Sequence, residues 1–333
     1  MKRITAILIC LLLVISLLPA LPSCADKTDD GKIRILCTLF PQYDWIKNIV
    51  GNSDSISVEL LIKNGTDPHS YQPTAADIME ISNCDMIIYL GATSDVWVQE
   101  ALKRANNEST ERLALAELNG ITLHNVSSSS HSHEEDGHDH HDDHDGHNHG
   151  ALDEHLWLSL SNATIAIEQI ADRLALLDTE NAESYLANAA AYTAALGELD
   201  AKYKAAVESS PADNRFMLFA DRFPFVYLLS DYGIEYKAAF EGCTTDVDAD
   251  FDTVLGLIKE AEEHSVRYVA ITETADGALA RTVAQSAKGN IEIIVMNSLQ
   301  SVTQKQLKDG ISYLRVMEDN LTALKTAIGA TGE

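Results

Sequence analysis

The sequence predicts an α/β protein of two lobes, each a roughly four-stranded parallel sheet with flanking helices, joined by one long rigid helix. Two observations lead to this class. Short apolar runs alternate with helical segments at about thirty residues per unit, which is typical of parallel sheets. A long helical stretch then separates the first set of units from the second. A cleft between two such lobes is a natural place for a small ligand.

The first lobe is expected to contain four strands with helices between them. Its strands are short apolar runs bounded by turn residues, and Thr74 and Asp77 have the spacing of a capping box that starts a helix. The expected strands are 33–39, 57–62, 85–90 and 121–126, and the expected helices are 42–50, 74–83 and 95–106.

The middle of the chain is expected to be helical. After a helix at 161–177, a second helix at about 181–208 would be roughly 42 Å long at about 1.5 Å per residue, enough to lie along both lobes. Beyond Pro211 the alternation of strands and helices resumes. The expected strands there are 215–220, 234–239, 267–272 and 291–296, and the expected helices are 223–232, 250–263, 277–287 and 305–328.

The N-terminus has the features of a lipoprotein signal peptide at residues 1–23. Lys2 and Arg3 precede a run that is almost wholly apolar, and the residues before Cys24 are similar to a bacterial lipobox, in which the cysteine receives the lipid. Cys24 is therefore the predicted lipid anchor, which indicates a location on the extracytoplasmic face of the cell membrane. The other expected regions are a tether at 24–31, an N-terminal α/β lobe at 32–160, a helical segment at 161–210 that includes the interlobe helix, and a C-terminal α/β lobe at 211–333.

Charge and cysteine content narrow the classes of partner and of metal site. The formal net charge of −27 over 333 residues makes nucleic acid an unexpected partner, because phosphate contacts need clustered Lys and Arg. Cys37, Cys84 and Cys243 do not have the spacing of a zinc knuckle. They are either buried thiols or residues with a role that the sequence leaves open.

A histidine-rich segment at 127–150 interrupts the α/β pattern. It contains eight of the twelve histidines and no apolar residue, so we expect a mobile, solvated loop that gathers metal ions. A solvated acidic loop without a metal role is the alternative. The predicted accessory metal ligands are His131, His133, His138, His140, His141, His144, His147 and His149.

Two further histidines are candidates for a fixed site. His69 follows a predicted strand, and ligands in parallel α/β sheets bind beyond the carboxyl ends of strands. His155 directly precedes the apolar run Leu156 to Leu158, where the chain can pack again. Neutral imidazole is the commonest protein ligand for Zn²⁺, so the two histidines predict a metal site.

Together these motifs resemble the zinc- and manganese-binding lipoproteins of bacterial ABC importers. The resemblance is carried by the lipobox, the stretch 65–71 around His69, the acidic histidine-rich loop, the stretch 153–158 around His155, and a last helix that includes 313–321. It implies two α/β lobes joined by a rigid helix, with one divalent metal in the cleft.

The resemblance also implies a ligand set. His69 and His155 match the first two ligands of the family. The usual third and fourth positions are Ala220 and Asn297 in this chain, so neither has the usual side chain. Asp221 and Glu273 are the candidate replacements, and a loop histidine or a water could also complete the shell. Asp67 and Asp153 are expected to orient the neighbouring imidazoles.

The function that this implies is a high-affinity zinc receptor, not an enzyme, that delivers Zn²⁺ to an ABC transporter permease. We expect it to be a monomer held at the membrane by its lipid anchor, without nucleic acid as a partner. Mn²⁺ is the alternative metal, because carboxylate ligands suit it better than imidazole does. The alternative functions are an adhesin-like surface lipoprotein with a divergent site, motivated by Ala220 and Asn297, and a metallo-hydrolase, for which the sequence offers no recognisable base or nucleophile beside the histidines.

Overall fold

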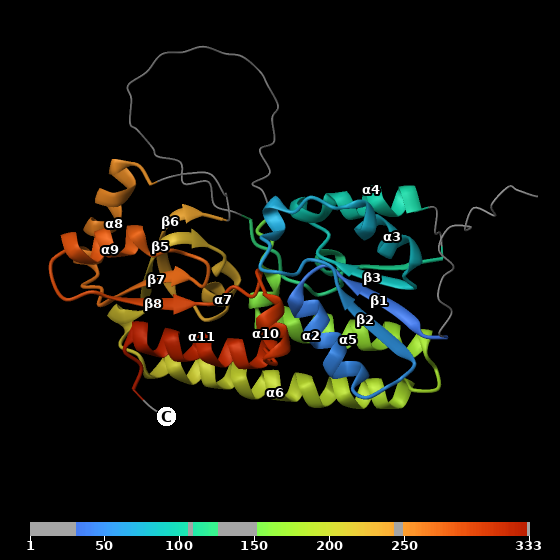
Figure 1. The fold of residues 1–333 in the computed structure, drawn as a ribbon. Helices are drawn as coiled ribbons and strands as arrows, with labels where there is room; N and C mark the ends of the chain where they lie inside the picture. Colours follow the sequence, from blue (N-terminus) through green and yellow to red (C-terminus); the bar gives the residue numbers. More distant parts are fainter. Residues whose placement is uncertain (1–30, 106–108, 126–151, 243–248, 332–333) are drawn as a thin grey trace, which may run out of the picture. The chain divides into compact units, whose positions relative to one another are not determined.

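Within the described residues, two parallel four-stranded sheets form the framework of the protein (Figure 1). The computed structural model describes residues 31–105, 109–125, 152–242 and 249–331. The first sheet has the order β2-β1-β3-β4, and the second has the order β6-β5-β7-β8. The predicted fold class is therefore confirmed.

The first sheet is built from short strands whose helices return the chain in the same direction. In register, Ile35 of the central strand β1 lies between Val58 of β2 and Met86 of β3. The capping box predicted at Thr74 and Asp77 starts helix α3. The strands are β1 (Ile33–Cys37), β2 (Ile56–Leu60), β3 (Met86–Tyr89) and β4 (Glu111–Ala114), and the helices are α2 (Phe40–Val50), α3 (Ala75–Asn83) and α4 (Val96–Ala105).

The second sheet repeats the strand order of the first. Its central strand β5 pairs with β6 on one side and with β7 on the other. The strands are β5 (Phe216–Phe223), β6 (Glu235–Glu241), β7 (Tyr268–Thr272) and β8 (Glu292–Met296), and the helices are α7 (Val226–Asp231), α8 (Phe251–Glu263), α9 (Ala278–Ser286), α10 (Gln304–Lys308) and α11 (Tyr313–Ile328).

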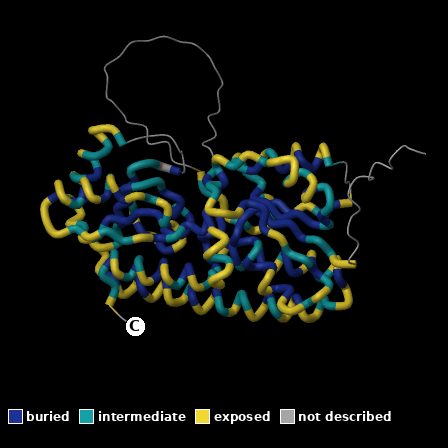
Figure 2. Tube along the Cα trace, viewed as in Figure 1, coloured by how far each residue is buried: buried dark blue, intermediate teal, exposed yellow. Residues whose placement is uncertain are grey.

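The predicted long helix is present and contacts both halves. Helix α6 (Ala182–Ser209) has 28 residues. It packs against α2 and α5 (Leu160–Leu177) beside the first sheet, and against α11 beside the second (Figure 1). One hydrophobic core includes residues of both halves, among them Ile35, Trp157, Phe219 and Tyr313, and buried positions concentrate on the two sheets (Figure 2).

Two predicted elements are wrong. The described part of 121–126 is not a strand, because its pairing is limited to one isolated antiparallel bridge between Asn125 and Leu152, and the fourth strand is β4 instead. The closing helix predicted at 305–328 is two helices. The chain turns at Gly310, which has a positive φ of 79°, and Ser312 then caps α11 by accepting a hydrogen bond from the backbone N–H of Arg315.

The described residues include two of the cysteines named above. Cys37 and Cys84 are free, buried thiols, and burial raises the pKa of the Cys37 thiol. Cys24 and Cys243 lie outside the described residues. In the part of the chain that the structure describes, no helix has the length and apolar character needed to cross a membrane.

A buried carboxylate connects three helices of the fold and gives a test of pH-dependent stability. Asp44 of α2 is only 7% exposed, and its Oδ2 accepts hydrogen bonds from the Tyr192 hydroxyl of α6 (2.9 Å) and the Tyr313 backbone N–H (3.2 Å). Burial raises the pKa of Asp44 to about 6, although both hydrogen bonds lower it in part. The folded protein therefore binds a proton at this site more tightly than the unfolded chain, whose aspartates titrate near about 3.9.

We expect Asp44→Asn to remove a stabilisation that grows on acidification. As the pH falls from about 7 to about 4.5, the wild type should gain about 1–3 kcal/mol in free energy of unfolding relative to the variant. Urea unfolding at both pH values measures the difference, with the exposed Asp213→Asn as the control. A difference between wild type and Asp44→Asn that does not change with pH would contradict the assignment.

Candidate metal site

The structure brings the two predicted histidines together, although 86 residues separate them in the sequence. The Nε2 atoms of His69 and His155 lie 3.4 Å apart, and the ring centroids are 5.4 Å apart. Two imidazole nitrogens bound to one tetrahedral Zn²⁺ at about 2.0–2.1 Å are about 3.3–3.4 Å apart. The observed separation therefore equals the separation expected for two nitrogen ligands of one tetrahedral zinc ion.

His69 is held by the loop that follows β2. Asp67 caps the 3₁₀ turn Pro68–Ser70 by accepting a hydrogen bond from the backbone N–H of His69 (2.9 Å). The other oxygen of Asp67 forms an ion pair with Nη1 of Arg222 in β5 (2.7 Å). Asp67 thus contacts the main chain of His69, and not its imidazole as the sequence led us to expect.

His155 is fully buried and has the orienting partner that was predicted. Asp153 Oδ1 lies 3.0 Å from His155 Nδ1 and also accepts from the His155 backbone N–H (2.9 Å). In the tautomer that donates Nδ1–H to the Asp153 carboxylate, Nε2, which lies 3.4 Å from His69 Nε2, carries the lone pair that metal binding requires.

Glu154 lies at the candidate site and was not among the residues that the sequence predicted. One of its oxygens, Oε2, lies 3.5 Å from Nδ1 of His69, and the other accepts from the backbone N–H of Ser94 (2.8 Å). The side chain is only 6% exposed. Consecutive carboxylates therefore lie beside the two imidazoles. Asp153 is hydrogen-bonded to His155, whereas Glu154 Oε2 lies near His69 Nδ1 and is buried without a hydrogen-bond partner among the described residues. The signal was the acidic pair directly before His155.

Gln300 is the second missed residue, and it comes from the other half of the protein. Its Oε1 atom lies 3.0 Å from Nε2 of His155, on the side of the ring that also faces His69. Gln300 is 3% exposed. A neutral amide carries no metal-site signal in a sequence, and only the fold brings residue 300 to residue 155.

The two candidate carboxylates lie at the ends of neighbouring strands in the second half. Asp221 Oδ2 accepts from the backbone N–H of Thr272 (2.9 Å) and from its hydroxyl. Glu273 accepts from the backbone N–H and the hydroxyl of Ser298 (2.8 Å each). Burial raises the pKa of the Glu273 carboxyl, the bonds from Ser298 lower it in part, and the charge of Asp221 adds to the increase.

Asp221 and Glu273 are hydrogen-bonded to Thr272 and Ser298, so their roles as metal ligands stay predictions. Across residues 31–105, 109–125, 152–242 and 249–331, no three side chains of His, Cys, Asp or Glu gather as a metal site. The residues at the two positions where the family resemblance places ligands, Ala220 and Asn297, have other structural roles. Ala220 is a buried core residue, and the side chain of Asn297 accepts from the backbone N–H of Leu299 (2.8 Å). The eight loop histidines predicted as accessory ligands lie outside the described residues: His131, His133, His138, His140, His141, His144, His147 and His149.

The sequence profile described as "zinc-uptake complex component A periplasmic" (ZnuA) matches residues 35–327. The chain belongs to the ZnuA family. It is 30% identical over 304 residues to the high-affinity zinc uptake system protein ZnuA of Bacillus subtilis, a match that covers 91% of this chain and 90% of that protein.

Other ZnuA-family relatives are longer than this chain. The zinc-binding protein AdcA of Streptococcus pyogenes is 29% identical over 314 residues, and the match covers 91% of this chain but 58% of AdcA. The zinc-binding lipoprotein AdcA of Streptococcus pneumoniae is 30% identical, with 100% of this chain and 62% of that protein covered. The chain thus spans about three fifths of the length of these relatives.

Solved structures agree with the ZnuA-type fold. The metal-dependent lipoprotein YcdH of Bacillus subtilis superimposes with a TM-score of 0.71 at 26% identity, covering 89% of this chain and 99% of that one. The Zn(II)-bound ZnuA-like domain of Streptococcus pneumoniae AdcA gives a TM-score of 0.70 at 29% identity, covering 90% and 99%. The ZnuA family is described by metal uptake and not by a catalysed reaction.

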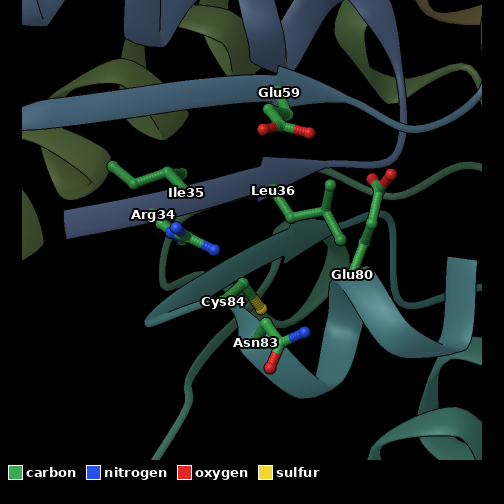
Figure 3. A pocket seen from close by; sticks show the side chains of 7 residues that line it. All are labelled: Arg34, Ile35, Leu36, Glu59, Glu80, Asn83 and Cys84. Atoms are coloured by element: carbon green, nitrogen blue, oxygen red, sulfur yellow. The ribbon is translucent and has the colours of Figure 1, made fainter. Parts of the chain in front are cut away.

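Two hollows lie on the first half of this ZnuA-family protein, and they differ in whether a histidine of the candidate site lines them. One, of about 340 Å³, is lined by polar and aromatic residues that include Tyr71, Trp97 and Glu154, and it opens onto His69. The other, of about 90 Å³, lies between β1, β2 and α3 and is lined by residues such as Arg34, Glu59 and Glu80 (Figure 3). His69 lines the first hollow and neither histidine lines the second, so the first is the hollow that adjoins the candidate metal site.

Proposed function

We propose that this protein is an extracytoplasmic receptor that binds Zn²⁺ with high affinity between its two halves and delivers it to an ABC transporter permease. One observation carries the proposal: two imidazole Nε2 atoms 3.4 Å apart, each backed by a buried carboxylate. Carboxylates behind ligand imidazoles orient the rings and increase their basicity. The names of the relatives AdcA and ZnuA support zinc as the cargo.

Charge and ligand chemistry support Zn²⁺ over Mn²⁺. The two nitrogen ligands would be neutral, and the negative charge that balances the cation would come from Asp221 and Glu273, with Asp153 and Glu154 adding charge beside the imidazoles. Mn²⁺ prefers direct carboxylate ligands, whereas imidazole suits Zn²⁺. Asp221 and Glu273 remain the proposed carboxylate ligands, and each would exchange its present hydrogen bonds with Thr272 or Ser298 for the metal.

The remaining parts of the proposal concern location and partners. Cys24 would carry the lipid that holds a monomeric receptor at the outer face of the membrane, which is consistent with the family description as periplasmic and with a relative named a lipoprotein. The histidine-rich loop at 127–150 would raise the zinc concentration near the site. No catalytic step is part of the proposed function.

The decisive experiment uses a soluble form that begins after Cys24 and lacks residues 131–149. Zinc titration against a competing chelator should show one tight site, and His69→Ala should abolish it. His264→Ala is the matched control, because His264 stacks on Phe216 in the second half and has no place in the proposed site. If the loop-deleted form has no tight site, zinc binding belongs to the loop and the proposed receptor site is wrong.

A further inference from the structure

We propose that Arg222 is a positioning residue for the metal site, and that its ion pair with Asp67 holds the loop that carries His69 against the second half. We call this loop, residues 63–73, the β2–α3 loop. The inference rests on the proposed function and goes beyond it, because it names what sets how long the protein retains zinc. Arg222 acts through Asp67 and the main chain of His69, without contact to the metal.

A continuous series of contacts runs from the second half to His69. Nη1 of Arg222 lies 2.7 Å from Asp67 Oδ2, and Asp67 Oδ1 accepts from the backbone N–H of His69 (2.9 Å). Nη2 of Arg222 donates to the hydroxyl of Thr274, just beyond β7 (3.5 Å). The side chains of the pair are only 22% and 19% exposed, so solvent and salt screen it less than an ion pair on the open surface.

An irregularity in β5 allows Arg222 to reach across to the first half. From Phe219 to Arg222, β5 advances by three residues while its partner β6 advances by two. A bulge of this kind interrupts the alternation of side chains along a strand and often re-aims a residue beside a functional site. Asp221 then bonds to Thr272 within the second half, whereas Arg222 bonds to Asp67 in the first.

Two further hydrogen bonds join the β2–α3 loop to the second half. The backbone N–H of Gly65 donates to the Val302 carbonyl (3.0 Å), and the Ser301 hydroxyl donates to the Thr66 carbonyl (3.4 Å). Gly65 has a φ of +74°, a conformation that glycine adopts without strain. The start of the loop is therefore docked by its main chain, and the ion pair of Asp67 extends the docking towards His69.

The ion pair is present together with the separation of the imidazoles that suits zinc. The Nε2 atoms of His69 and His155 lie 3.4 Å apart while Asp67 is bonded to Arg222. His155 is buried and hydrogen-bonded to Asp153, so the position of the β2–α3 loop decides whether the two nitrogens keep this separation. Ordering a loop at the moment of binding reduces affinity, whereas ordering it in advance does not. The ion pair should therefore slow the release of zinc.

The first test measures zinc release from the soluble form that lacks residues 131–149, by stopped-flow mixing with an excess of chelator. Arg222→Met and Asp67→Asn should each speed release about 10-fold, as loss of a partner behind a metal ligand typically does. Asp67→Asn keeps an oxygen that can accept from the His69 N–H. The double variant should be no faster than the faster single variant, because both substitutions remove the same contact.

Two further variants show that the effect belongs to this ion pair. Arg222→Lys should recover part of the slow release, because lysine keeps the charge but lacks the planar fork that reaches both Asp67 and Thr274. Lys288→Met is the matched control. It removes an exposed ion pair with Glu262 in the second half and should leave the rate of zinc release unchanged.

The second test needs no metal. Amide hydrogen exchange of residues 63–70 in the metal-free protein reports on the docking of the β2–α3 loop, because local opening exposes amides such as that of Gly65. We expect faster exchange there in Arg222→Met and in Asp67→Asn, and unchanged exchange in Lys288→Met. Urea unfolding of the same metal-free forms shows whether each variant keeps its global stability.

The outcomes separate this inference from the proposed function. If charge alone mattered, Arg222→Met would slow the release of a cation and Asp67→Asn would speed it, so opposite effects overturn the inference. Unchanged exchange of the loop in both variants also overturns it. If the unsubstituted protein has no tight zinc site, the proposed function fails, and hydrogen exchange still decides whether the ion pair holds the loop. If Arg222→Met does not fold, unchanged exchange in Asp67→Asn overturns the inference.

Discussion

Replacing His155 with alanine should weaken zinc binding by more than about 100-fold. Partners behind the ligands of a metal site typically contribute about 10–100-fold, and a direct ligand contributes more than its support. Nε2 of His155 contacts both His69 and Gln300, so the substitution removes both contacts. Chelator competition on the soluble, loop-deleted form measures the effect.

One control variant and one unfolding measurement show whether the loss of zinc affinity comes from the missing ligand or from a damaged fold. His124→Ala removes another ring near this segment, one that packs edge-on against Tyr227, and should leave zinc affinity within about threefold, below the tenfold change that about 1.4 kcal/mol produces. The metal-free His155→Ala protein should still unfold cooperatively. Zinc affinity near that of the wild type in His155→Ala would exclude the paired-histidine site.

Replacing Trp157 with alanine should lower the free energy of unfolding by about 3–5 kcal/mol, the usual cost of removing a large buried aromatic side chain. Trp157 is 1% exposed and its indole N–H donates to the Ser298 carbonyl (2.8 Å). Its own carbonyl accepts from the Tyr313 hydroxyl (2.6 Å). The alanine variant would therefore leave a cavity and an unpaired carbonyl where the two halves meet. Urea unfolding of the metal-free protein measures the loss.

Trp157→Phe distinguishes the two causes, because it keeps most of the ring volume and removes only the indole donor. It should cost about 1–3 kcal/mol, the cost of leaving the Ser298 carbonyl unpaired together with a small cavity. If Trp157→Ala itself loses less than about 1 kcal/mol, the segment around His155 does not have the structural importance assigned to it.

Local patterns were sufficient to predict most of the fold. The apolar run that became β3 is buried at every position, and the capping box at Thr74 lies where helix α3 begins. Prediction failed where tertiary context decides. An apolar stretch after Gly120 looked like a strand, but the sheet is completed by β4, whose first residues Glu111 and Arg112 are polar. Gly310 divided a helix whose apolar periodicity continues on both sides.

The candidate site was predictable only in part, for a similar reason. His69 and His155 have side chains that indicate metal binding in any context, and the fold then brought them together. Glu154 and Gln300 have ordinary polar side chains whose importance comes from what they face. Only the contacts across 85 residues from His69 to Glu154, and across 145 residues from His155 to Gln300, give them a role.

The support of the segment 153–157 has a consequence for the order of folding. Its partners in the second half are the Tyr227 hydroxyl on the Asp153 carbonyl, the Ser298 carbonyl on the Trp157 indole, and the Tyr313 hydroxyl on the Trp157 carbonyl. These contacts are separated by 74 to 156 residues of chain. Contacts between distant residues form only after the entropy of loop closure has been paid. A nascent chain that ends before residue 298 has both histidines, Asp153 and Tyr227, but lacks the two contacts of Trp157 with Ser298 and Tyr313. The segment 153–157 therefore gains its full support only when the last part of the chain has joined the fold.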